Sequence, residues 1–331
     1  MSEGQRIEHL TTDQKVQGLN LCGRTVYDTQ MHLIKLKVFL FRILRKLLPS
    51  VWRFKSKNDY SSLRNNLQER LILLKTGTTW DTYQLKIYSE IERLGISRFR
   101  LSSTVIGTMD PPIPYLIDNV LALNSNDRAY LKKLAKNYIR VGGGKRGTVY
   151  YCASDSRIHK ILTLFELKSE LNKFYNSNMK ISGMGPLEIV EFGGGIGQMA
   201  ELVIRELNPK TYTIIDLPIV STLAEYYLDQ QNLNYKINFI GAEDELLLLD
   251  KSTKVFISSW AISEISLDAR KRIEKYMEKM DYLFIEVQDY FDGIDNYGWI
   301  TTFLVRNPQF ISTSTRSDRT KRSRLYKIQR I

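Results

Sequence analysis

The sequence predicts an α/β fold with a mainly parallel sheet, and three observations carry this prediction. From residue 187 onward, short apolar runs alternate with helical stretches, as in parallel strands joined by crossover helices. A glycine-rich turn follows the first of these runs, at residues 193–197. Two further apolar runs, 310–315 and 324–329, flank a basic turn and predict a C-terminal antiparallel hairpin.

The remaining elements follow from the same patterns in chain order. The strands are predicted at 187–192, 212–217, 237–240, 254–260 and 282–287, with helices at 198–207, 218–230 and 268–280. Upstream, helical patterns cover 60–75, 80–94, 126–140 and 158–176, and we take the glycine-rich loop 141–147 as a hinge. We therefore expect three parts: a basic N-terminal segment (1–58), a mainly helical accessory or substrate-cap region (59–180) and the α/β domain (181–331).

Composition narrows the class of protein. The chain has 331 residues and a net charge of +12, but residues 1–60 carry +6 and residues 306–331 carry +7, which leaves −1 for residues 61–305. A nucleic-acid enzyme would more often spread basic residues over its catalytic face, so no nucleic acid is expected as a partner. With two cysteines, no signal-peptide pattern and no long apolar run, we expect a cytoplasmic protein.

Residues 31–48 predict an amphipathic helix that ends at Pro49. Lys35, Arg42, Arg45 and Lys46 share one face at helical spacing. Such a helix can lie on an anionic membrane, which would place the protein at the inner face of the membrane. It can equally dock on the protein's own core or pair two protomers as a homodimer.

The glycine-rich turn is the most informative motif. Its pattern is E-x-G-x-G-x-G from Glu191, at the end of a strand and before a helix. Glycines allow a sharp turn and a close approach to a ligand, and the helix start offers free N–H groups. The acid suits a cationic ligand, such as S-adenosylmethionine (SAM) with its sulfonium and amino groups.

A dinucleotide cofactor is the rival interpretation, but G-x-G-x-x-G does not fit from either Gly193 or Gly194. The next strand ends in Asp216, where an acid can accept hydrogen bonds from ribose hydroxyls. We therefore predict SAM as cofactor. The predicted contacts are Glu191, Gly193, Gly194, Gly195, Gly197, Asp216, Leu217, Glu243, Ser259 and Trp260.

Four segments resemble the sugar O-methyltransferase family, a group of class I SAM-dependent methyltransferases. They are Glu191-Phe-Gly-Gly-Gly-Ile-Gly, Ile215-Asp-Leu-Pro218, Tyr226-Tyr-Leu and Ser258-Ser-Trp-Ala-Ile-Ser-Glu264. The resemblance covers roughly residues 140 to 300. It implies a Rossmann-like class I methyltransferase sheet and methylation of a sugar hydroxyl, often in surface polysaccharide biosynthesis. The first two segments also resemble plant O-methyltransferases, but their catalytic histidine has no counterpart here, since no histidine follows His159.

A general base would assist methylation of a sugar hydroxyl. Candidates are Asp289 and Glu264, which follow the fifth and fourth strands, and His159 on a helix upstream. For substrate contacts we predict Tyr290, Asn296 and Trp299, since aromatic rings suit the C–H faces of sugars.

A divalent metal stays undecided, because acids near Asp289 are too loosely spaced to predict a site. Two other functions also stay open. One is methylation of another small-molecule hydroxyl or amine, and the other is a non-catalytic interaction module on a methyltransferase scaffold.

Overall fold

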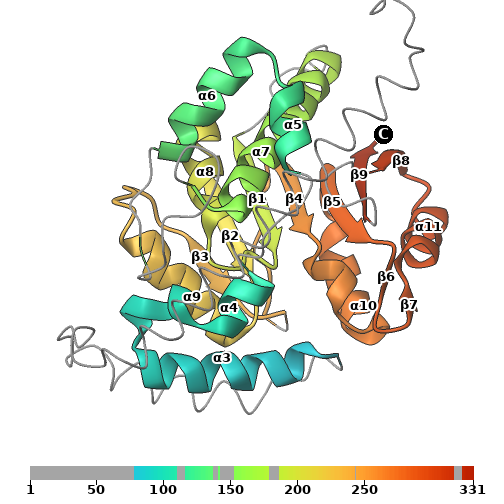
Figure 1. Cartoon of the computed structure of the whole chain (residues 1–331). Helices are drawn as coiled ribbons and strands as arrows, with labels where there is room; N and C mark the ends of the chain where they lie inside the picture. The colour runs from blue at the N-terminus through green and yellow to red at the C-terminus, as the bar shows by residue number, and fades with distance from the viewer. Residues whose placement is uncertain are drawn as a thin grey trace, which may run out of the picture. The chain divides into compact units, whose positions relative to one another are not determined.

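The computed structural model describes residues 78–109, 116–136, 141, 153–178, 186–242, 244–316 and 323–331. All of them belong to one unit, Tyr60–Ile331. Its centre is a seven-stranded sheet in the order β3-β2-β1-β4-β5-β9-β8 (Figure 1). Neighbouring strands from β3 to β5 run parallel, and β9 pairs antiparallel with both β5 and β8. The predicted Rossmann-like parallel sheet with a C-terminal antiparallel hairpin is therefore confirmed.

Every strand predicted from the apolar runs occurs, with ends within two residues of the prediction. The seven strands of the sheet are β1 (Leu187–Phe192), β2 (Thr211–Ile215), β3 (Asn238–Ile240), β4 (Thr253–Ser259), β5 (Tyr282–Gln288), β8 (Phe310–Arg316) and β9 (Ser323–Arg330). A second, two-stranded sheet that was not predicted pairs β6 (Tyr290–Phe291) with β7 (Ile294–Asp295).

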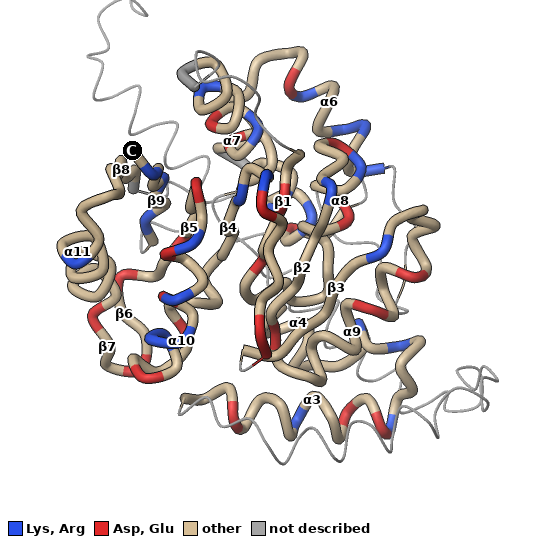
Figure 2. Tube along the Cα trace, turned by 180° about the vertical axis from the view of Figure 1, so that it is seen from behind, with Lys and Arg blue, Asp and Glu red and all other residues tan. Residues whose placement is uncertain are grey.

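Side chains alternate between the two faces of the sheet and bury both. On one face, Ile189 and Phe284 join the core under the helices from α3 (Trp80–Leu94) to α9 (Pro218–Asp229). On the other, Val190 and Leu283 join the core under α10 (Leu267–Met277) and α11 (Asn296–Arg306). Because the period is two, Glu191 and Glu286 point to the first face, and Figure 2 marks the acidic positions within β1 and β5.

The described residues of the accessory region are mainly helical, as predicted for 80–94, for most of 126–140 and for all of 158–176. Its elements are α3 (Trp80–Leu94), the 3-10 helix η2 (Ile96–Leu101), α4 (Ser103–Thr108), α5 (Leu116–Ala122), α6 (Ser125–Lys136) and α7 (Asp155–Asn178). A buried Arg157 on α7 pairs with Glu201 on α8 and donates to the carbonyl of Leu134 on α6. The helical region is thus tied directly to the first helix of the α/β domain.

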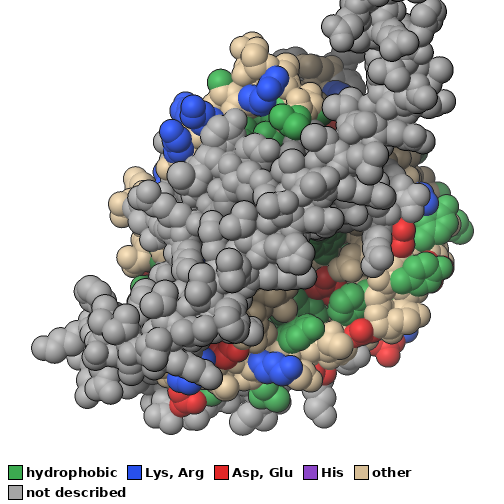
Figure 3. Space-filling view, in the orientation of Figure 1, with side chains coloured by type: hydrophobic (Ala, Val, Ile, Leu, Met, Phe, Trp, Pro, Cys, Tyr) green, Lys and Arg blue, Asp and Glu red, His purple; other side chains and the backbone are tan. Residues whose placement is uncertain are grey.

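The helices that connect or follow the strands are α8 (Gln198–Leu207), α9 (Pro218–Asp229), the 3-10 helix η3 (Ala261–Glu264), α10 (Leu267–Met277) and α11 (Asn296–Arg306). Helix α11 was not predicted. Hydrophobic side chains gather on the surface over α11 and the β6–β7 hairpin (Figure 3), among them the exposed Tyr290, Tyr297 and Val305.

Two predicted helices, 31–48 and 60–75, lie outside the described residues, as does the glycine-rich part of the 141–147 loop. The predicted limits at 58 and 180 stay predictions. Within the part of the chain that is described, no helix combines the length and apolar character needed to cross a bilayer.

Candidate functional site

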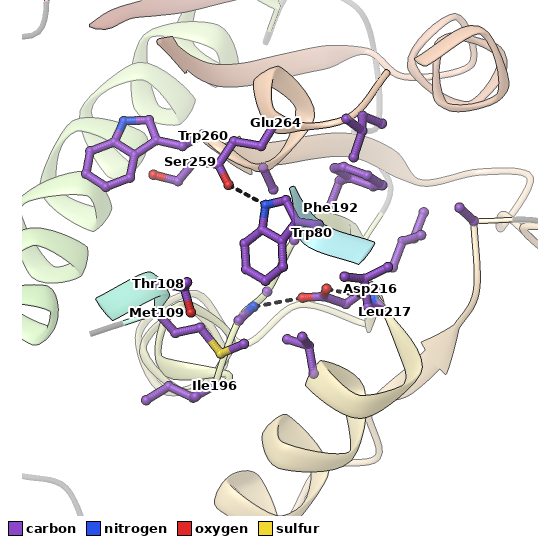
Figure 4. A pocket seen from close by; sticks show the side chains of 18 of the residues that line it. Trp80, Thr108, Met109, Phe192, Ile196, Asp216, Leu217, Ser259, Trp260 and Glu264 are labelled. Carbon is purple, nitrogen blue, oxygen red and sulfur yellow. Dashed lines mark hydrogen bonds between the residues drawn. The ribbon is translucent and has the colours of Figure 1, made fainter. Parts of the chain in front are cut away.

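A pocket of about 1280 Å³, counting the open space at its mouth, lies at the carboxyl ends of β1, β2 and β4. This is where ligands bind in open parallel sheets. One side is formed by the glycine turn and Asp216, and another by Ser259 to Ala261 (Figure 4). The accessory helices complete the wall with Trp80 from α3 and Met109, which follows α4.

Two positions of the turn require glycine for different reasons. Gly193 has φ +74°, and a Cβ there would lie 1.9 Å from the Cβ of Ala261. Gly195 has φ +57°, and a Cβ there would meet nothing within 4 Å. The turn therefore packs tightly against the segment after β4 at Gly193, whereas Gly195, which lines the pocket, leaves space for a ligand.

Gly197 does not line the pocket. It caps the start of α8 with φ +81°, and a Cβ there would lie 2.8 Å from Leu228. Its predicted contact with the cofactor stays a prediction that no pocket contact supports. The structure explains this glycine by helix capping and by packing against α9.

Asp216 lies where the motif predicted it, on the pocket wall beside Leu217. Its two carboxylate oxygens accept hydrogen bonds from the backbone N–H groups of Gly195, at 2.9 Å, and Leu217, at 2.7 Å (Figure 4). Burial raises the pKa of Asp216 to about 7, although these N–H donors oppose the shift. Each oxygen has a second lone pair, so the side chain can still accept from a ligand hydroxyl.

Glu191 lies behind the glycine turn and does not line the pocket. Its carboxylate accepts a hydrogen bond of 2.8 Å from the hydroxyl of Tyr212 on β2, and a Cβ added at Gly194 would lie 3.3 Å from one of its oxygens. Burial raises the pKa of Glu191, while the charge of Lys160 and the Tyr212 hydroxyl lower it. The side chain supports the turn from below, and a direct contact between Glu191 and the cofactor stays a prediction.

The segment after β4 is held in an uncommon conformation. Trp260 has φ +72°, which is costly for a residue with a Cβ. Its backbone N–H donates to the carbonyl of Glu286 at 2.8 Å, and the N–H of Ile262 donates to Ser258 Oγ at 3.2 Å. These bonds hold Ser259 and Trp260, both predicted cofactor contacts, on the pocket wall.

His159 also lines the pocket, although its side chain is almost fully buried. Its ring stacks on Trp260 with centroids 5.3 Å apart, and its Nε2 lies 3.5 Å from a carboxylate oxygen of Glu286. The Ser259 and Ser323 hydroxyls donate to Glu286 at 3.2 and 3.1 Å. No sequence pattern pairs His159 with Glu286, which lies more than a hundred residues further along the chain.

Glu264, the second predicted base that lines the pocket, is held by two donors. Trp80 Nε1 donates to one carboxylate oxygen at 2.8 Å, and Gln288 Nε2 donates to the other at 2.5 Å. Burial raises the pKa of Glu264 above its usual value, and the two donors partly oppose this. A carboxylate with a raised pKa is a better proton acceptor than an ordinary surface acid.

The third candidate base, Asp289, is not on the pocket wall. Its carboxylate lies 3.7 Å from Arg324 Nε. Of the predicted substrate contacts, Tyr290 is exposed on the β6–β7 hairpin and Asn296 is fully buried at the start of α11. Trp299 belongs to the core and donates from Nε1 to Glu274 at 2.7 Å. Glu243 lies outside the described residues.

The sequence predicted His159 from the helical accessory region, but it did not predict the other residues that this region adds to the pocket wall. These residues are Trp80, Thr108, Met109, Ser156 and Lys160. They lie between 30 and 120 residues before the glycine turn, and no spacing rule connects them to it. Among the residues that the structure describes, no cluster of three or more His, Cys, Asp or Glu side chains could hold a metal ion.

The fold and the site together define a Rossmann-like α/β protein with a glycine turn at a ligand pocket. No family model matches the chain, and no curated protein matches it. The chain is similar to solved methyltransferase structures at low identity.

One is the plantazolicin methyltransferase BpumL, solved with SAH (S-adenosylhomocysteine), at 10% identity over 82% of this chain and 99% of that chain, with a TM-score of 0.40. Another is the magnesium protoporphyrin IX methyltransferase of Synechocystis, solved with SAM, at 13% identity over 63% of this chain and 99% of that chain, with a TM-score of 0.38. The methyltransferase domain of bacterial CtHen1 has 10% identity over 48% of this chain and 96% of that chain, with a TM-score of 0.35.

Proposed function

We propose that this chain is a SAM-dependent methyltransferase. The observation that carries the proposal is the joint placement of the glycine turn and Asp216 on one pocket at the carboxyl ends of β1 and β2. Gly195 offers open space where a side chain would intrude, and Asp216 retains lone pairs for the ribose hydroxyls. Leu217, Val220 and Ala242 supply apolar surface for an adenine ring.

Bound SAM would supply an electrophilic methyl group on a sulfonium. The acceptor oxygen forms a bond to this methyl carbon as the carbon–sulfur bond breaks, and the acceptor's proton must go to a base. Glu264 is the proposed base, and two observations support it: its carboxylate is on the pocket wall, and Trp80 and Gln288 orient it. His159 is the alternative base, oriented by Glu286. Asp289 has the weakest support, because no pocket contact brings it to the reacting atoms.

The proposed acceptor is a sugar hydroxyl, in surface polysaccharide or glycan biosynthesis. This finer proposal is supported by the resemblance of the segment from Ser258 to Glu264 to the sugar O-methyltransferase family. Methylation of another small-molecule hydroxyl or amine is the competing outcome, and a scaffold without catalytic activity is the other.

Calorimetry with SAM and SAH tests the cofactor proposal on the full chain. The wild-type protein should bind both, and Asp216→Ala should lose roughly 1.5–3 kcal/mol of binding free energy, the cost of removing a charged hydrogen-bond partner. If neither ligand binds the wild type, or if Asp216→Ala binds as well as the wild type, the proposed site is wrong. Mass spectrometry of cell-surface glycans with and without the protein, looking for a missing methyl increment, then tests the acceptor.

Substitution of the two pocket-lining candidates tests the base. Glu264→Gln should lower turnover by roughly 10²–10⁴-fold if Glu264 takes the proton, while SAM affinity stays near that of the wild type. If His159→Ala shows this loss instead, His159 is the base. Full turnover in both variants, and in Asp289→Asn, would mean that no side chain takes the proton and that positioning alone suffices.

A further inference from the structure

Trp80 is the one large aromatic side chain among the described residues that reaches the pocket from helix α3. Two hydrogen bonds join the start of α3 to segments that lie about two hundred residues later in the chain. Trp80 Nε1 donates to Glu264 at 2.8 Å, and the backbone N–H of Thr79 donates to Asp292, on the β6–β7 hairpin, at 3.1 Å. The accessory region therefore contributes the indole ring of Trp80, held in place by these contacts, to a pocket that is otherwise formed mainly by the α/β domain.

Figure 4 shows the position of the Trp80 indole ring in the pocket. The indole lies between Glu264, to which its nitrogen is joined, and Asp216 on the opposite side. Half-buried, Trp80 keeps part of its surface open to the cavity that it lines. A flat apolar surface thus lies directly beside a carboxylate.

Glu264 is held from two sides, yet it can accept more. Trp80 and Gln288 each donate one hydrogen bond, to different carboxylate oxygens. Each oxygen has a second lone pair, so a ligand hydroxyl can donate to the same group. Gln288, on β5, does not line the pocket, and its amide serves to orient Glu264.

We infer that Trp80 and Glu264 form the acceptor subsite, which binds a neutral hydroxylated ring, such as a pyranose, with its C–H face on the indole and one hydroxyl on the carboxylate. This inference rests on the proposed methyl transfer and names the residues that select its acceptor. Aromatic faces suit the apolar face of such a ring, and a carboxylate suits its hydroxyl.

The chemistry of methyl transfer favours a hydroxyl over an amine at this place. An amine beside Glu264 is stabilised as ammonium, and an ammonium has no lone pair with which to attack the methyl carbon. A hydroxyl that donates to Glu264 retains its lone pairs and already points its proton at a base. The negative charge of Asp292 lies close enough to act on Glu264, which also disfavours an anionic group there.

Saturation-transfer NMR on the full chain saturated with SAH tests the inference. The probes are the methyl glycosides of glucose, galactose, mannose and rhamnose. Ethanolamine, an amine, and catechol, a planar phenol, are the comparison ligands. At least one methyl glycoside should show transfer to its ring C–H protons. Trp80→Ala should weaken its binding by about five- to tenfold, the loss expected for one aromatic stacking contact. Trp80→Phe, which keeps a ring but lacks the donor, should retain the transfer.

Leu85→Ala is the matched control, since Leu85 lies on α3 with 64% of its surface exposed. It should behave as the wild type. SAH affinity by calorimetry should stay within a factor of about three in all variants, which also shows that they are folded. If Trp80→Ala does not fold, Glu264→Gln serves instead and should weaken the glycoside without weakening SAH.

Several outcomes would overturn the inference while the proposed function stands. A change of tenfold or more in SAH affinity for Trp80→Ala would mean that the indole borders the cofactor. Equal glycoside binding in Trp80→Ala and wild type, transfer to ethanolamine or catechol only, or no transfer to any probe would each exclude this subsite. Failure of the wild type to bind SAH would instead remove the proposed function itself.

Discussion

At the scale of single residues, Asp216 couples the proposed cofactor site to pH. Its pKa is raised to about 7, chiefly by burial, so the folded protein retains a proton that an ordinary aspartate with a pKa near 3.8 would have lost. Because the folded state binds more protons than the unfolded state between these two values, the stability contribution of Asp216 falls as pH rises through this window. Ligand binding should follow the opposite trend, since the carboxylate accepts more hydrogen bonds than the acid.

We therefore expect SAH affinity to rise as pH increases from about one unit below to one unit above this pKa, and Asp216→Asn to remove most of the rise. In the absence of ligand, the wild type should lose the stability contribution of Asp216 over the same pH range, whereas Asp216→Asn should not. The melting temperature of the variant should therefore rise relative to that of the wild type. Calorimetry and thermal unfolding at matched pH values measure the two trends. If Asp216→Asn retains the full pH dependence of SAH binding, another group causes it.

The two glycines of the turn give a second expectation at this scale. Alanine at either position must adopt a left-handed backbone, at a cost of about 1–2 kcal/mol. At Gly193 it must also displace Ala261, whereas at Gly195 it enters open pocket space. Gly193→Ala should therefore lose much more stability in urea unfolding, while Gly195→Ala should stay folded and lose SAH affinity. Similar stability losses in both variants would contradict this reading of the turn.

Motif spacing predicted Asp216 and Gly193 to Gly195 on the pocket because the strand–turn–helix unit is local. It could not separate them from Glu191 and Gly197, which belong to the same motif but face the interior. The face on which Glu191 lies depends on the alternation along β1 and on Tyr212 in the next strand. Likewise, Trp299 was predicted on the substrate, but a partner 25 residues earlier, Glu274, holds its indole in the core.

At the scale of elements, apolar periodicity predicted every strand of the seven-stranded sheet and the helices that connect the parallel strands. It missed α11, since Asn296 to Arg306 begins with turn-forming residues in the aromatic segment after β5, for which we predicted only substrate contacts. Contacts with the rest of the fold stabilise this helix. The Asp295 side chain caps the helix by accepting from the N–H of Gly298 at 3.0 Å, and Ile300 and Phe303 bury its inner face.

Arg270, near the start of α10, stabilises a segment that lines the pocket. It is fully buried and donates to the carbonyl groups of Ile265 at 3.0 Å and Ser263 at 2.9 Å. Its guanidinium also lies 4.8 Å from the ring of Trp299, and burial lowers the pKa of Arg270 to about 10. The segment held in this way carries Glu264.

Arg270→Leu should therefore destabilise the fold, because two buried carbonyl groups lose a charged donor, each at a cost of about 1–3 kcal/mol. The looser segment should also weaken the hold on Glu264 and lower turnover more than SAM affinity. Lys271→Ala, one position along the same helix and exposed, is the control. Urea unfolding and steady-state kinetics measure both effects, and unchanged stability of Arg270→Leu would exclude this supporting role.

At the scale of the whole chain, the pocket is built from segments far apart in sequence. The glycine turn, the segment after β4 and the accessory helices meet only through the sheet topology. For this reason the sequence could predict the side of the pocket that is formed by the glycine turn and Asp216. It could not predict the Trp80–Glu264 contact, which joins residues separated by 184 positions.

The basic ends of the chain raise the question of where in the cell the protein lies. Residues 31–48 lie outside the described residues, so their amphipathic pattern stays a prediction. Lys35, Arg42, Arg45 and Lys46 on one face would each contribute about 1 kcal/mol of attraction to an anionic membrane, in addition to apolar burial. Such binding should weaken as salt is raised, because mobile ions screen the lipid charge.

We therefore expect the full chain to sediment with anionic vesicles at low salt and to be released at high salt, while a chain that begins near Asn58 stays in solution and still binds SAH. Neutral vesicles are the control, since they should retain little of either protein. If the shortened chain sediments equally well, residues 31–48 are not the anchor, and the basic C-terminal residues become the next candidate. If the full chain never sediments but is dimeric, and the shortened chain is monomeric, the helix is a subunit contact.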